Sequence, residues 1–143
     1  MSKRQRLLPF VLAIVLVIAL ASMSLNGVAA TKEHQADFSV VFLTTGTSIL
    51  QGTFGNVNLS VASLDNFASP ISLTFSAPPG VWASFNGLSQ INTVADGTNS
   101  RTVTIYVSEA VAPGFYPFTV TAFSGTITHS VILQLLVLPY NCL

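Results

Sequence analysis

The sequence predicts an all-β domain, an antiparallel β-sandwich of about seven to nine short strands, behind an N-terminal hydrophobic helix. From Asp37 onward, apolar and polar residues alternate with a period of two, which is typical of strands with one buried face. Turn signals rich in glycine, proline, asparagine and aspartate separate these segments at intervals of roughly 8 to 12 residues. Helical periodicity is absent from this part of the sequence, which argues against an α/β arrangement.

The N-terminal segment predicts export. Lys3, Arg4 and Arg6 precede an apolar run over residues 7–20, and a stretch of small residues ends at Ala30. This order of features is typical of a signal peptide that is cleaved near Ala30. The mature protein is therefore expected to be extracellular or held at the cell surface.

A retained membrane anchor is the alternative to cleavage. Residues 7–25 carry no charge, and their number is close to the roughly 20 that a helix needs to span a bilayer. Basic residues stay on the cytoplasmic side, so an uncleaved segment also holds the rest of the chain outside. Membrane contact is expected only through residues 7–25, and only if the leader is uncleaved.

The chain is expected to have one folded domain. Residues 1–30 form the leader, 31–36 a flexible tail, 37–138 the sandwich and 139–143 a C-terminal tail. Removing 30 residues from 143 leaves 113, which is enough for one domain with its own core.

Formal charge is scarce. Charged residues make up 7% of the chain, against about 25% in ordinary globular proteins. Two cations and five carboxylates remain after the leader is removed, a net charge of −3. The remaining sequence has no cluster of Lys and Arg residues that could bind the phosphates of a nucleic acid, so nucleic acid is not an expected partner.

The alternation defines the expected strands and turns. Strands are predicted within residues 38–42, 57–61, 71–75, 81–85, 91–94, 103–107, 116–120 and 127–138. Pro78-Pro79-Gly80 and Ala112-Pro113-Gly114 mark turns between them. Asn86-Gly87 predicts a two-residue type I′ hairpin that leads to Ile91.

Four segments resemble the Ig-like domains of bacterial and archaeal surface proteins. They are residues 55–67 (GNVNLSVASLDNF), 79–85 (PGVWASF), 112–116 (APGFY) and 128–130 (THS), and the resemblance covers roughly residues 37–138. It implies an Ig-like sandwich in which Tyr116 occupies the tyrosine-corner position of a late strand. Pro117 departs from the usual residue there and favours an edge or a bulge, because proline lacks a ladder donor. The shared motifs are structural and imply a fold, not a function.

The sequence shows no catalytic set. His34 lies in the expected tail and His129 in the last strand, and no motif links either to a serine. Both methionines lie in the leader, which leaves too few soft ligands for a copper or zinc site. We expect a protein that is not an enzyme, with no cofactor and no catalytic or metal site. His129 is expected to have a structural role, hydrogen-bonded at the sandwich rim.

A calcium site is an alternative at two acidic turns, Asp65-Asn66 and Asp96-Gly97. Both turns can share one end of the sandwich, and carboxylate oxygens are the ligands that calcium prefers. The other interpretation is turn chemistry, because Asp and Asn tolerate such geometry without an ion.

Two aromatic side chains are candidates for an interaction surface. If Val81 and Ala83 face inward, Trp82 must face outward, and the same parity places Phe115 opposite Tyr116. A glycan ring or a partner protein can stack on either side chain, whereas cover by a neighbouring loop is the other interpretation.

The last strand becomes apolar on both faces. Its second face carries Ile132, Leu136 and Leu138, whereas a half-buried strand keeps one polar face. One explanation is a central strand covered on both faces. The other is strand exchange between copies of the chain, with residues 38–43 as the donated segment behind the flexible tail.

Two single residues complete the candidates. Asn58 begins the sequon Asn58-Leu59-Ser60 on the outward parity of its strand and is a candidate for N-glycosylation. Cys142 has no intrachain partner because the chain holds one cysteine, which leaves an incidental thiol or an intermolecular disulfide.

These features predict a non-enzymatic, secreted or surface-tethered Ig-like domain with a structural or adhesive role. It is expected to serve as a subunit of an extracellular filament or an envelope layer, with itself, other surface proteins or glycans as partners. The alternative is an extracellular carbohydrate-binding or ligand-binding module with Trp82 and Phe115 as its platform.

Overall fold

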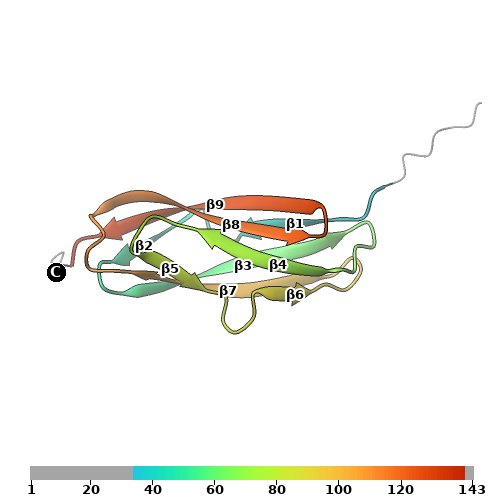
Figure 1. The fold of residues 1–143 in the computed structure, drawn as a ribbon, viewed down its shortest axis with the longest axis horizontal. Helices are drawn as coiled ribbons and strands as arrows, with labels where there is room; N and C mark the ends of the chain where they lie inside the picture. The colour runs from blue at the N-terminus through green and yellow to red at the C-terminus, as the bar shows by residue number, and fades with distance from the viewer. Residues whose placement is uncertain (1–33, 141–143) are drawn as a thin grey trace, which may run out of the picture. The chain divides into compact units, whose positions relative to one another are not determined.

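A computed structural model of the chain describes residues 34–140, which contain nine strands and no helix (Figure 1). The prediction of an all-β domain is confirmed for these residues. The strands are β1 (Asp37–Phe42), β2 (Gly46–Leu50), β3 (Phe54–Leu64), β4 (Pro70–Ser76), β5 (Val81–Ser84), β6 (Gln90–Asn92), β7 (Thr98–Val107), β8 (Gly114–Ser124) and β9 (Ile127–Leu138).

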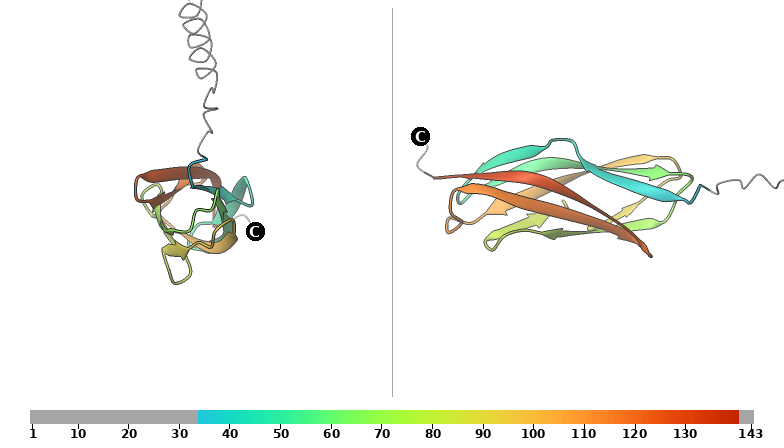
Figure 2. Two further views of the ribbon diagram at one scale, coloured as in Figure 1. Left: turned by 90° about the vertical axis from the view of Figure 1, so that its right-hand side faces the viewer. Right: turned by 90° about the horizontal axis from the view of Figure 1, so that it is seen from above.

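The strands form two sheets around one core. One sheet has four strands in the order β1-β3-β7-β5, and the other has five in the order β2-β9-β8-β4-β6. Seen along the sandwich, the strands surround a single interior, which the side chains of both sheets fill (Figure 2).

The alternation explains which side chains fill this interior. In β3, Val57, Leu59 and Val61 are buried, whereas Asn58 between them is exposed. The inward positions of β7 and β9 follow the same rule. Each fully buried aliphatic side chain stabilises the fold by about 1.5–3 kcal/mol. A shift of one residue in register would turn all inward side chains of a strand to the solvent and lose this stabilisation.

One strand pair differs from the expected antiparallel arrangement. β2 pairs in parallel with β9, from Gly46 opposite Gln134 to Leu50 opposite Leu138. The sequence analysis missed this strand, because Ile49 is its only fully buried side chain and its other residues are mostly polar. The chain therefore crosses from one sheet to the other between β1 and β2.

The predicted hairpin at Asn86-Gly87 is wrong. Both residues have the positive φ angles of such a turn, 46° and 106°, but the flanking strands do not pair with each other. β5 pairs with β7, and β6 pairs with β4 in the other sheet. The crossing buries Ile91 to 1% exposure opposite Ile71, a tertiary contact that outweighs the local turn preference.

The start of β8 carries the two features that the sequence singled out. The Tyr116 hydroxyl donates a hydrogen bond to the main-chain oxygen of Ala112 at 2.8 Å, which is the geometry of a tyrosine corner. Pro117 lies opposite Gln134 of β9, but the pairing with β4 on the other side ends at Thr119. β8 is thus an edge strand at Pro117, which explains why a residue without an N–H is tolerated there.

The residues that the structure describes begin after the predicted leader. Residues 34–140 contain no helix that is long and apolar enough to cross a membrane. The predicted signal peptide, the possible anchor over 7–25 and Cys142 lie outside the described residues.

Candidate functional site

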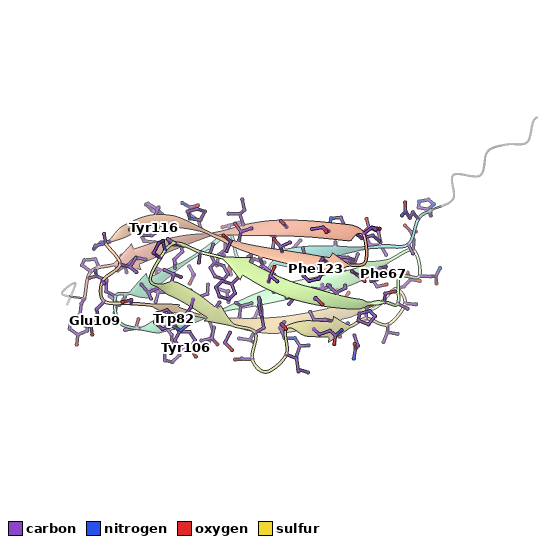
Figure 3. All side chains as sticks on the ribbon, viewed as in Figure 1. Phe67, Trp82, Tyr106, Glu109, Tyr116 and Phe123 are labelled. Atoms are coloured by element: carbon purple, nitrogen blue, oxygen red, sulfur yellow. The ribbon has the colours of Figure 1, made fainter. Side chains whose placement is uncertain are left out.

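Three aromatic side chains lie in a row across the outer face of the four-stranded sheet. Phe54 of β3 and Trp82 of β5 both stand opposite Tyr106 of β7 in the strand register. The ring centroids of Trp82 and Tyr106 are 5.7 Å apart with planes 9° from parallel, and those of Phe54 and Tyr106 are 5.7 Å apart at 43°. Figure 3 shows Trp82 and Tyr106 side by side. We call these three residues the aromatic row.

The backbone fixes the outward direction of this row. Tyr106 lies between the buried residues Ile105 and Val107, so it must point away from the core. Phe54 is 62% exposed and Trp82 is 50% exposed. Large apolar side chains that are gathered on a surface mark interaction sites more often than scattered ones do.

A second row of polar residues runs beside the aromatic row on the same face. The Thr104 hydroxyl donates to Asn56 Oδ1 at 2.7 Å, and Asn86 Oδ1 lies 3.3 Å from the same hydroxyl. Thr104 is itself buried, so its hydroxyl is a fixed anchor for both amides. We call Asn56, Thr104 and Asn86 the amide row. Neither row contains a formally charged side chain.

The outer face of the five-stranded sheet carries a different apolar surface. Phe115 and Ile132 are 68% and 63% exposed, and Leu136 lies directly opposite Phe115. Ile132 lies four residues before Leu136 in β9, opposite Thr119. We call Phe115, Ile132 and Leu136 the β8–β9 patch. A shallow hollow of about 390 Å³ adjoins it, lined by Thr45, Gly46, Thr47, Ser48, Phe115, Gln134 and Leu136.

The structure shows how the last strand is covered. β9 lies between β8 and β2, and Leu136 and Leu138 are half-buried beside β2. Ile132 remains exposed, so the expectation of a central strand covered on both faces is wrong for the described chain at this position. Residues 38–42 of the segment suggested for strand exchange pair with β3 of their own chain.

Trp82 and Phe115 do not form one platform. Trp82 belongs to the four-stranded sheet and Phe115 to the five-stranded sheet. The neighbour of Trp82 is Tyr106, with Phe54 on the far side of Tyr106, and the neighbour of Phe115 is Leu136.

His129 is hydrogen-bonded, as the sequence predicted. Its Nε2 lies 2.7 Å from Asp37 Oδ1, and its ring packs edge-on against Phe38 with centroids 4.9 Å apart. The hydrogen bond from His129 lowers the pKa of the Asp37 carboxyl, desolvation opposes this shift, and the Phe38 N–H adds to the lowering. The pair joins β1 of one sheet to β9 of the other.

The two acidic turns meet at one end of the sandwich, as expected, and bind each other directly. Asp96 Oδ1 accepts a hydrogen bond from the Asn66 N–H at 3.0 Å. Asp65, Asn66 and Asp96 all have positive φ, between 51° and 62°, which Asp and Asn tolerate. Within residues 34–140, no group of three or more His, Cys, Asp or Glu side chains is placed to hold a metal ion.

Asn58 is exposed on the same outer face as the aromatic row. Its Oδ1 lies 3.2 Å from the Thr102 hydroxyl, which donates to it. The amide nitrogen that would carry a glycan is therefore directed away from that bond.

Phe54, Tyr106, Asn56 and Thr104 were not among the site residues that the sequence predicted. Parity alone places Tyr106 on the outer face, because it lies between two inward aliphatic residues. Its position beside Trp82 depends on the register between β5 and β7, which no local pattern reveals.

No protein-family model and no curated protein sequence matches this chain. Solved structures resemble its fold. Domains 4 and 5 of the S-layer protein SbsC match with a TM-score of 0.51 and 17% identity, over 72% of this chain and 53% of that one. A family 123 glycoside hydrolase from Clostridium perfringens matches with a TM-score of 0.55 and 9% identity, over 71% and 27%.

A FixG-related protein from Vibrio parahaemolyticus matches with a TM-score of 0.54 and 11% identity, over 71% of this chain and 95% of that one. This chain spans about half the length of the SbsC structure and about a quarter of the hydrolase. At such identities the likeness shows the fold alone.

Proposed function

We propose that this chain is an exported, non-enzymatic Ig-like domain with a structural or adhesive role at the cell surface, a subunit of a filament or an envelope layer. The observation that carries the proposal is the β8–β9 patch, an exposed apolar surface on an outer sheet face. Large apolar side chains that are exposed on the same sheet face are candidates for contacts with other proteins.

The strand order supports the Ig-like part of the proposal. The four-stranded sheet has the order of the A, B, E and D strands of an Ig domain, and β9, β8 and β4 have that of G, F and C. β2 and β6 are additional edge strands. The hydrogen bond from Tyr116 to Ala112 supplies the tyrosine corner of this fold class.

The leader supports a location outside the cytoplasm. Its basic start, apolar run and small-residue end direct a chain to export whether or not it is cleaved. The likeness in fold to domains of an S-layer protein agrees with a place in a surface layer.

The chemistry of the described residues supports a non-enzymatic role. His129 forms a hydrogen bond with Asp37, and its ring packs against Phe38. Both contacts give this side chain a structural role. A hydrolase among the fold neighbours does not transfer its activity, because folds of this kind host many functions.

Burial of the patch in an assembly contact would be favourable in free energy. Covering Phe115 and Ile132, which are both about two-thirds exposed, would contribute about 1–2 kcal/mol per side chain. Neighbouring hydroxyls of β2 and the Gln134 amide offer hydrogen bonds at the rim of the hollow.

Electron microscopy of the exported protein tests this proposal. The protein is produced with its own leader, recovered from the exported fraction and imaged, and filaments or layers are the expected result. Ile132→Ser is expected to reduce them. Val94→Ser is the matched control, because Val94 is also exposed, at 71%, but lies in a loop outside the patch. Single particles at all concentrations would contradict the proposal.

A further inference from the structure

We infer that the aromatic row and the amide row together form a binding platform for a neutral glycan chain. The platform lies on the four-stranded sheet, whereas the β8–β9 patch lies on the other sheet, so this inference is independent of the proposed assembly contact. Three features point to such a ligand, namely the spacing of the rings, the free amide groups and the lack of charge.

The ring spacing follows from the strand spacing. Neighbouring strands lie about 4.7–4.9 Å apart, and Phe54, Tyr106 and Trp82 each come from a different neighbouring strand. Each strand contributes one ring, and the centroids of neighbouring rings are 5.7 Å apart. This step is close to the length of a pyranose unit, so a linear glycan that crosses the strands meets an aromatic ring at each sugar.

The ring orientation suits the apolar face of a sugar. Trp82 and Tyr106 are stacked with their planes 9° from parallel, so each ring covers part of the other, and Trp82 still keeps half of its area exposed to a ligand. The C–H groups on one face of a pyranose are apolar and pack on the electron-rich face of an aromatic ring. The tilt of Phe54 by 43° allows a bent chain to keep contact at that end.

The amide row supplies hydrogen bonds to hydroxyl groups. The Thr104 hydroxyl donates its one proton, with Asn56 Oδ1 at 2.7 Å as the nearer acceptor and Asn86 Oδ1 at 3.3 Å, so the NH₂ group of each amide is turned away from the hydroxyl. Among the hydrogen bonds of residues 34–140, none engages these two NH₂ groups. Two oriented donors beside a row of rings match a ligand that has one apolar face and many hydroxyl oxygens.

The absence of formal charge from both rows favours a neutral glycan over an acidic one. A protein partner is less well matched, because contact cores between proteins bury few oriented, unfilled amide donors. A protein that binds this face is thus an outcome that would overturn the inference.

The test uses the exported full chain and the fluorescence of Trp82, which is the only tryptophan of the protein. Cellohexaose, chitohexaose, xylohexaose and maltohexaose are titrated separately, each with isothermal calorimetry alongside. At least one is expected to shift the Trp82 emission to shorter wavelength and to bind with micromolar to millimolar affinity. No shift and no heat with all four would overturn the inference.

Variants assign the binding to this face. Phe54→Ala and Asn56→Ala are each expected to weaken binding at least tenfold, while Trp82→Phe keeps most of it. Phe115→Ala is the matched control, because it removes an equally exposed aromatic residue from the other sheet without effect on glycan affinity. Equal losses with Phe115→Ala, or unchanged affinity with Phe54→Ala in a variant of native melting temperature, would overturn the inference.

Discussion

His129 and Asp37 form a hydrogen-bonded pair that joins the two sheets, with Nε2 and Oδ1 separated by 2.7 Å. The pair links the first strand of the fold to the last, over 92 residues of sequence. Because a chain with one cysteine cannot form an intrachain disulfide, such contacts and the apolar core hold the two sheets together.

This pair makes stability depend on pH. The pKa of Asp37 is lowered below its ordinary value of 3.8, so its contribution is present above that value and is lost as the pH falls through the lowered pKa. We expect the melting temperature to fall on acidification below about pH 4, and Asp37→Asn to reduce that fall. Thermal melts of both proteins between neutral pH and about pH 2 measure it. Parallel curves would contradict the role of Asp37.

The tyrosine corner predicts a defined loss of stability. Tyr116→Phe removes the hydrogen bond to Ala112 and keeps the ring, so the free energy of unfolding is expected to fall by about 1 kcal/mol. Tyr106→Phe is the control, because the Tyr106 hydroxyl has no hydrogen bond among residues 34–140. Urea unfolding of the two variants should separate them, and equal stabilities would argue against the corner.

Gly80 is required by both its backbone and its surroundings. Its φ is +85°, and an added Cβ would lie 2.7 Å from Cγ2 of the buried Val111. Gly80→Ala is expected to cost more than about 2 kcal/mol, from strain and from overpacking together. Gly125→Ala, at φ +59° with nothing within 4 Å, is expected to cost only the backbone strain of about 1–2 kcal/mol. Chemical unfolding gives the difference, and a Gly80 variant as stable as the Gly125 variant would refute the predicted clash.

Asn58 is predicted to accept a glycan in a host with N-glycosylation machinery. The side chain is exposed, and the sequon residues Leu59 and Ser60 follow it in β3. Intact mass spectrometry of the exported protein should show an added glycan mass that Asn58→Gln and Ser60→Ala both remove. An unmodified mass in such a host would contradict the prediction.

The alternation of residue types predicts much of this fold, since it reports which face of a strand is buried. It places the inward residues of β3, β7 and β9 correctly. It fails at β2, where one buried Ile49 gives too weak a pattern, and at Asn86-Gly87, where a tertiary contact of Ile91 outweighs the local turn. The candidate site is harder to predict, because the aromatic row exists only through the register of three strands.

The proposed function depends on association of the chain through the β8–β9 patch. Sedimentation velocity over a concentration series measures it directly, with the exported protein compared to a Phe115→Ser, Ile132→Ser double variant. The account predicts that the sedimentation coefficient of the unaltered protein rises with concentration while that of the double variant remains at the monomer value. A concentration-independent monomer for the unaltered protein, or identical curves for both proteins, would contradict it.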